Sequence, residues 1–401
     1  MRIEFSPPDI TEAEIQAVTD VLRSGWITTG PQTKLFEQEL AAWCGTPKVA
    51  CLNSATAALE CALRLLGVGP GDEVITGAYT YTASASVICH VGATPVLVDV
   101  APGSYEMDYQ ALAKAVTSKT KVVIPVDIAG VMCDYQQITH QLTQVAALYS
   151  PTPGTLQQLF DRVIILADGA HSFGATRGGS PSGSVADFTA FSFHAVKNLT
   201  TAEGGALTWR PRAGLDDQQL YEQIMLYSLH GQSKDALAKT KAGAWEYDVV
   251  APLYKCNMTD IFAALGRAQL QRYPQMLQRR RAIFERYAEQ LASDKVEFLQ
   301  HFTPQGSSSA HLCLVRLLGK DQDFRNRFIE GMAQRQVSCN VHYKPLPLLT
   351  AYKDLGFDIK DFPNALAQFS NEVTLPLYSI LTDDQVDYVI QCFQEVYREL
   401  G

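Results

Sequence analysis

Short apolar runs alternate with amphipathic segments through the first third of the chain. Apolar residues spaced three and four apart predict helices over residues 11–23, 33–44, 55–66, 82–89 and 109–115. The apolar runs between them predict strands over residues 48–52, 73–75, 94–99 and 122–126. This alternation is typical of an α/β fold with a mostly parallel sheet, in which functional sites form at the carboxyl ends of the strands.

The remainder of the chain predicts a second, smaller unit. A long helical stretch extends from about residue 260 to about residue 293, and a strand follows near residues 311–316. A chain of 401 residues usually divides into two domains. We therefore expect a large α/β domain over residues 1–259 and a smaller C-terminal α+β domain over residues 260–401.

Composition excludes several classes of function. A net charge of −9 disfavours nucleic-acid binding, because proteins that bind polyanions cluster Lys and Arg on one surface. The nine cysteines lack C-x-x-C spacing and are interpreted as reduced thiols of a cytoplasmic protein, and no metal site is predicted. No secretory leader opens the chain, and no apolar run approaches the ~18 residues of a membrane span.

Polar residues that follow two apolar runs carry the candidate chemistry. The run 163–166 leads to Asp168, and a second, aromatic-rich run leads to Ser192 and then to Lys197. Asp168 could hold a pyridine nitrogen protonated, and Lys197 could supply the amine for a Schiff base, which are the two requirements of pyridoxal phosphate chemistry. The hydroxyl of Ser192 could donate to the cofactor phosphate. Alone, Asp168 could be a turn residue and Lys197 a surface lysine, but their combined spacing favours the cofactor interpretation.

A helix start supplies a candidate phosphate site. Asn53-Ser54-Ala55-Thr56-Ala57 opens the predicted helix 55–66, where unpaired backbone N–H groups and the positive end of the helix dipole favour an anion. We expect the amides of Ala55 and Thr56 to contact the phosphate. An ordinary Ser or Asn cap is compatible with the same residues.

These motifs, together with others in the same order, resemble the sugar aminotransferases of the DegT/StrS family. The others are Gly25-Trp26-Ile27-Thr28-Thr29-Gly30-Pro31, Thr80-Tyr81-Thr82-Ala83-Ser84, Gly92-Ala93-Thr94-Pro95-Val96, His230-Gly231, Tyr254-Lys255-Cys256-Asn257-Met258-Thr259-Asp260-Ile261, Asp361-Phe362-Pro363-Asn364-Ala365 and Leu375-Pro376-Leu377-Tyr378. The resemblance covers nearly the whole chain. It implies the fold of type I pyridoxal-phosphate enzymes, with a mostly parallel seven-stranded sheet in the large domain.

The resemblance also implies roles for further residues. Tyr81 is expected to stack on the pyridine ring, and His171 to lie near the ring and its phenolic oxygen. Lys255 and Asn257 are expected to reach the cofactor phosphate of a neighbouring subunit, so that a homodimer with shared active sites is the catalytic unit. His342 is a substrate-contact candidate, in a segment where Leu346 or Pro347 replaces a second His usual in the family.

One connection departs from the family pattern. The stretch between Asp134 and Asp168 is longer than usual and contains Pro151-Thr152-Pro153-Gly154, which breaks a helix. We interpret this stretch as a surface insertion that either packs against the fold or extends the rim of the substrate site.

The activity implied by the resemblance is transfer of an amino group from glutamate to a UDP- or dTDP-linked keto sugar. The cofactor would alternate between pyridoxal 5'-phosphate and pyridoxamine phosphate. C4 of a UDP-linked 4-keto-6-deoxy-hexose or pentose is the expected position, and C3 of a 3-keto sugar is the alternative. Lys197 disfavours a dehydratase, because dehydratases of this family carry His there. A pyridoxal-phosphate-binding regulator is also disfavoured, since no DNA-binding module is appended.

Overall fold

A central sheet organises the computed structural model, which describes residues 1–233 and 246–401. Its seven strands lie in the order β1-β9-β8-β5-β4-β2-β3. They are β1 (Val49–Leu52), β2 (Glu73–Gly77), β3 (Thr94–Val98), β4 (Thr120–Ile124), β5 (Ile164–Asp168), β8 (Phe188–Ser192) and β9 (Gly205–Trp209). Strands from β3 to β8 pair in parallel, whereas β9 is antiparallel to both β8 and β1. The predicted α/β fold with a mostly parallel seven-stranded sheet is therefore confirmed.

Helices cover both faces of this sheet, which explains why its strands are continuously apolar. Successive strand residues point to opposite faces, so Ile164 and Ile165 belong to different apolar clusters. Ile164 shares its cluster with residues of α3 (Ala55–Leu65) and α4 (Ala83–His90). Ile165 shares the other cluster with residues of α5 (Tyr109–Ala115) and α6 (Tyr135–Gln144).

The connection between α6 and β5 packs against the fold. Leu156 and Leu159 contact the apolar cluster beneath α3. Gln157 is buried, and its Nε2 donates a hydrogen bond of 2.9 Å to the carbonyl of Leu66 at the end of α3. Of the two interpretations of this insertion, packing is the one that these contacts support.

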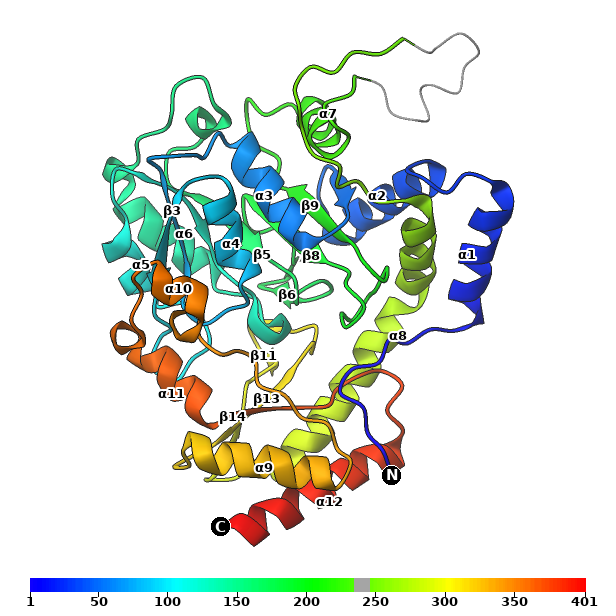
Figure 1. The fold of residues 1–401 in the computed structure, drawn as a ribbon, viewed down its shortest axis with the longest axis vertical. Coiled ribbons are helices and arrows are strands. Elements are labelled where there is room, and N and C mark those ends of the chain that lie inside the picture. The colour runs from blue at the N-terminus through cyan, green and yellow to red at the C-terminus, as the bar shows by residue number, and fades with distance from the viewer. Residues whose placement is uncertain (234–245) are drawn as a thin grey trace.

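Two N-terminal helices lie against a long helix that leads out of the sheet region. The helices α1 (Glu12–Ser24) and α2 (Pro31–Cys44) pack on α8 (Asp260–Leu291), and α7 (Asp217–Ser228) lies beside α3 (Figure 1). Asp260, the first residue of α8, is buried and accepts backbone N–H bonds from Gly30, Gln32 and Thr33 at 2.7–3.0 Å. The start of α2 is thus capped by a side chain from a distant part of the chain.

The C-terminal part has its own small sheet and core. The strands β10 (Val296–Phe298), β13 (Cys313–Leu317) and β14 (Glu372–Leu375) pair antiparallel in the order β10-β13-β14. They are packed with helices α9 (Gln322–Gln334), α11 (Pro363–Asn371) and α12 (Asp383–Leu400), and α10 (Thr350–Asp354) lies near α4 (Figure 1). The start of the chain also packs against this part, because Ile3 is buried in the C-terminal core and pairs with Val337.

A four-stranded sheet connects the two parts. It is made of β6 (Thr176–Arg177), β7 (Ser180–Pro181), β11 (Phe302–Thr303) and β12 (Gly306–Ser307), in the order β11-β12-β6-β7. Its two hairpins come from either side of α8 in sequence. Within the described residues, no helix combines the length and apolar character needed to cross a membrane.

Candidate active site

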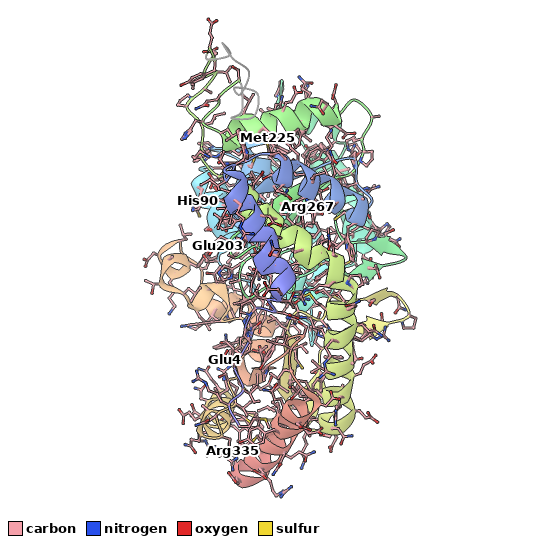
Figure 2. All side chains as sticks on the ribbon, turned by 90° about the vertical axis from the view of Figure 1, so that its right-hand side faces the viewer. Glu4, His90, Glu203, Met225, Arg267 and Arg335 are labelled. Carbon is pink, nitrogen blue, oxygen red and sulfur yellow. The ribbon has the colours of Figure 1, made fainter. Side chains whose placement is uncertain are left out.

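A cavity of about 380 Å³ lies where β5 and β8 end, as expected for a parallel sheet. Eight residues predicted from the sequence line it: Ala55, Thr56, Tyr81, Asp168, His171, Ser192, Lys197 and His342. Glu203, which is labelled in Figure 2, is also part of the wall. The wall draws on sheet, helix and C-terminal segments that are far apart in the chain.

Asp168 is the last residue of β5 and is buried. Its Oδ2 accepts a hydrogen bond of 2.7 Å from the Ser84 hydroxyl, and its Oδ1 accepts one of 3.1 Å from the backbone N–H of Ala170. Burial raises the pKa of Asp168, whereas these two bonds and the charge of Lys197 lower it. The carboxylate is held in one orientation beside the cavity.

Lys197 follows β8 in a turn closed by its own backbone N–H, which donates to the carbonyl of His194 at 2.9 Å. Burial lowers the pKa of the Lys197 amine to about 8, and the charge of Asp168 acts in the opposite direction. A lysine with this pKa has a substantial neutral fraction near neutral pH, which is the nucleophilic form.

The start of α3 forms another part of the wall. Ser54 caps the helix by accepting the N–H of Ala57 at 3.1 Å, so Ala55 and Thr56 lie in the first turn, where N–H groups lack helical acceptors. Gly205 lets β9 approach this turn closely, because a Cβ there would lie 2.2 Å from the carbonyl carbon of Ser54. Ser192 ends β8 on the same cavity. This arrangement of donors suits a phosphate group.

Tyr81 and His171 both line the cavity, but in different environments. Tyr81 is 60% exposed, and its ring lies 6.0 Å from that of Tyr343. His171 is buried, and its Nδ1 accepts the backbone N–H of Ala129 at 3.2 Å. Burial and the charges of Lys197 and His342 lower the pKa of His171 well below its ordinary value, so the imidazole is neutral.

Sequence reasoning missed Tyr343 and Ser84. Tyr343 lines the cavity, and its hydroxyl lies 3.1 Å from His171 Nε2. Ser84 lies within α4 and bonds to Asp168, as described above. Tyr343 adjoins the predicted His342, and Ser84 is the last residue of the motif Thr80-Tyr81-Thr82-Ala83-Ser84. The two motifs were therefore the available signals, although neither residue was assigned a role.

Lys255 and Asn257 do not line the cavity of their own chain. The Lys255 amine donates to Asn257 Oδ1, and Asn257 forms a bridge with Leu52 at the end of β1. The backbone N–H of Asn53 donates to the carbonyl of Cys256 at 2.8 Å. The loop therefore runs along the segment that enters α3, outside the cavity itself.

Known proteins resemble this chain in sequence and in fold. Residues 8–394 match the model of the DegT/DnrJ/EryC1/StrS aminotransferase family. The Bacillus subtilis spore coat polysaccharide biosynthesis protein SpsC is 38% identical over 404 residues, covering 99% of this chain and 97% of SpsC.

Solved structures match over the full length of the chain. Spr1654 from Streptococcus pneumoniae, assigned as a sugar aminotransferase and solved in its PMP form, is 54% identical with a TM-score of 0.97, and each chain is covered completely. Its PLP form is 53% identical with a TM-score of 0.96, again with complete coverage of both chains. The aminotransferase TlmJ from Streptoalloteichus hindustanus is 28% identical with a TM-score of 0.86 over both complete chains. The chain belongs to the DegT/DnrJ/EryC1/StrS aminotransferase family.

Proposed function

We propose that the protein is a pyridoxal-phosphate-dependent sugar aminotransferase that moves an amino group from glutamate to a nucleotide-linked keto sugar. The observation that carries this proposal is the placement of Lys197, Asp168 and the start of α3 around one cavity. Similarity to Spr1654, known in PLP and PMP forms, supports the cofactor and the sugar substrate class. Similarity to SpsC supports a role in polysaccharide biosynthesis.

The residues present fit this cofactor. The free N–H groups of Ala55 and Thr56, with the Ser192 hydroxyl, would hold its phosphate. Asp168 would accept a hydrogen bond from the protonated pyridine nitrogen, Tyr81 would stack on the ring, and His171 would lie near its phenolic oxygen. When bound, pyridoxal phosphate supplies an electron sink that stabilises negative charge on the carbon next to the transferred nitrogen.

Lys197 would perform two tasks. It would bind the cofactor covalently in the resting enzyme, and after release its amine would carry a proton between the amino-acid carbon and the cofactor carbon. A pKa of about 8 suits both tasks, because the amine can lose and regain a proton near neutral pH. This use of Lys197 also favours amination over the dehydration carried out by family members with His at this place.

Lys255 and Asn257 would complete the active site of a neighbouring subunit. Their position outside their own cavity, on a loop beside the entry to α3, supports this assignment. The catalytic unit would then be a homodimer with two shared sites.

C4 of a UDP-linked 4-keto-6-deoxy-hexose or pentose is the proposed acceptor position. C3 of a UDP- or dTDP-linked 3-keto sugar is the alternative. Incubating the purified protein with glutamate and a panel of UDP- and dTDP-linked 4-keto and 3-keto sugars, followed by mass spectrometry and NMR of the product, separates these possibilities. An amino sugar bearing nitrogen at C4 is expected. Failure to aminate any keto sugar, with active cofactor present, would contradict the proposed function.

A further inference from the structure

A buried carboxylate of the C-terminal sheet is connected to the cavity by hydrogen bonds. Glu372 is the first residue of β14 and is fully buried. Its Oε1 lies 2.6 Å from the Thr374 hydroxyl, and its Oε2 accepts the backbone N–H of His342 at 2.9 Å. The Thr374 oxygen lies 2.9 Å from His342 Nδ1. A continuous path therefore runs from Glu372 through Thr374 to the His342 imidazole, which lines the cavity.

The single proton of the Thr374 hydroxyl gives this path a direction. When Glu372 is ionised it can only accept, so Thr374 donates to it and must accept from His342 Nδ1–H. His342 Nε2 is then an acceptor. When Glu372 is protonated on Oε1, it donates to Thr374, which donates to Nδ1 and leaves the proton on Nε2. Burial and the charge of Lys197 lower the pKa of His342 to about 4, so the imidazole is neutral in both states.

The neighbouring Tyr343 is a donor in either case. His171 Nδ1 accepts from Ala129, so its proton lies on Nε2 and is directed to the Tyr343 oxygen. The Tyr343 hydroxyl proton has no other partner among the described residues, which leaves it available to a ligand in the cavity. His342 and Tyr343 both line the cavity, and their ring centroids lie 4.9 Å apart. An acceptor on the His342 ring and a donor on Tyr343 together match a hydroxyl group, which donates and accepts at once.

We propose that Glu372, acting through Thr374, sets which nitrogen of His342 carries the proton, and that when Glu372 is ionised the resulting acceptor, with Tyr343, binds a hydroxyl group of the keto sugar. This inference rests on the proposed function for its ligand. While Glu372 is ionised, a carboxylate of the amino donor has no proton for Nε2, so the pair then favours the sugar hydroxyl over the amino acid. Glu372 and Thr374 are positioning residues, since neither lines the cavity.

The charged and titratable groups facing Glu372 come from several elements. Arg325 of α9 is the cation, and Tyr79, Tyr105, Tyr343, Cys313 and Cys339 are the other ionisable neighbours. Burial raises the pKa of each of these phenols and thiols, so they stay neutral near neutral pH. Burial raises the pKa of Glu372 itself to about 8, against the bonds from Thr374 and His342 and the charge of Arg325. Glu372 therefore loses its proton as the pH rises through about 8, and His342 Nε2 changes from donor to acceptor.

Nitrogen-15 NMR of histidine-labelled holoenzyme tests the tautomer without any sugar. The His342 signals are assigned by their loss in His342→Gln. The wild type should carry the proton on Nδ1 at about pH 10 and on Nε2 at about pH 6, either side of the Glu372 pKa. Glu372→Gln, whose amide donates to Thr374, should hold the Nε2–H form at both values. A tautomer that is the same at both pH values in the wild type, or a Glu372→Gln variant that behaves like the wild type, would overturn the proposal.

Thr374 provides a second test should Glu372→Gln not fold. Thr374→Ser keeps the hydroxyl and should keep the pH response, whereas Thr374→Val should abolish it. Thr208→Val is the matched control, because Thr208 is a buried strand residue whose hydroxyl bonds to Thr46 and Lys48 away from the cavity. The control should behave like the wild type. A response that persists in Thr374→Val would contradict the path.

Kinetics then test the ligand. At pH above 8, Glu372→Gln and Thr374→Val should raise KM for the nucleotide-linked keto sugar by about 3- to 10-fold, the value of one neutral hydrogen bond. The half-reaction with glutamate should be unchanged. The same KM comparison is made with analogues of that sugar that each lack one hydroxyl. For the analogue that lacks the hydroxyl bound by His342 and Tyr343, wild type and variants should have the same KM. If every analogue shows the full difference, the pair does not bind a sugar hydroxyl, although amination itself would still establish the proposed function.

Discussion

Lys197 and Asp168 are two buried ionisable groups at one cavity, and burial acts on them in opposite senses. It lowers the pKa of the lysine to about 8 and raises the pKa of the aspartate, while the mutual attraction of the two charges opposes both shifts. Ser84 and the Ala170 N–H also stabilise the ionised carboxylate. The pair can thus hold a reactive amine beside a fixed negative charge.

The pKa of Lys197 gives a pH dependence for cofactor attachment. Only the neutral amine attacks an aldehyde, so the rate at which apoprotein binds pyridoxal phosphate covalently should rise with pH and level off above about 8. The rate is measured by absorbance after cofactor removal and re-addition. An ordinary lysine would show a rise that continues to about pH 10.4, and that result would contradict the effect of burial.

At the residue scale, the side chains that directly follow strands were predicted from the residues themselves, whereas Tyr343, which arrives from the C-terminal part, was missed. Asp168 and Ser192 end β5 and β8, and Lys197 follows β8, so the sheet brings them together at one edge. Tyr343 reaches the same cavity only because the C-terminal part packs back over it. The Tyr79 hydroxyl bond to the carbonyl of His342, at 2.8 Å, marks that contact. Such long-range packing cannot be derived from the residues themselves, and only the neighbouring candidate His342, which rests on the family resemblance, pointed to this segment.

The start of α2 shows how one element depends on another. Pro31 suits the first helical turn, but Gly30 has no side chain with which to cap it. Asp260 supplies the acceptor oxygens, receiving three backbone N–H bonds and the Thr33 hydroxyl at 2.7 Å. The helix pair α2 and α8 is therefore fixed by one buried carboxylate.

Replacing Asp260 with Ala should destabilise the protein strongly. The substitution removes the helix cap and leaves backbone N–H groups buried without an acceptor, so it should lower the free energy of unfolding by about 3 kcal/mol. Thermal and urea unfolding measure the effect. Asp260→Asn keeps one acceptor oxygen and should lose clearly less stability, so equal losses in both variants would contradict the capping role.

Element positions were predicted well where patterns are local. The helix predicted over residues 109–115 has the bounds of α5. The strand predicted over residues 122–126 corresponds to β4, but β4 begins and ends earlier, at Thr120 and Ile124. Pro125 has no N–H to donate, so the ladder ends before it. The antiparallel direction of β9 relative to β8 and β1 could not be predicted. It depends on the strands that flank β9, and no residue of β9 indicates the direction in which the strand runs.

For the whole molecule, the order of motifs predicted the family, and the match over residues 8–394 confirms it. The division into domains at residues 259 and 260 stays a prediction, as does the shared active site of a homodimer. Lys255 and Asn257 lie outside the cavity of their own chain. Replacing them should therefore affect the site of the partner subunit, so the shared active site can be tested.

Two inactive variants should complement each other if the sites are shared. Lys197→Ala and the double variant Lys255→Ala/Asn257→Ala are mixed and allowed to exchange subunits. One of the two sites in each hybrid dimer regains every group, so up to about a quarter of wild-type activity should return at equal mixing. Mass spectrometry of differently tagged subunits verifies the exchange. Absence of recovery despite exchange would contradict the shared site.

Mapping the residue to which the cofactor is covalently attached decides whether Lys197 is the residue that holds it. The holoenzyme is treated with borohydride, which fixes the cofactor on the amine that holds it, then digested and mapped by mass spectrometry. We expect a yellow protein that loses its colour and carries the modification on the peptide containing Lys197. Modification of another lysine, or no modification of a protein saturated with pyridoxal phosphate, would contradict it.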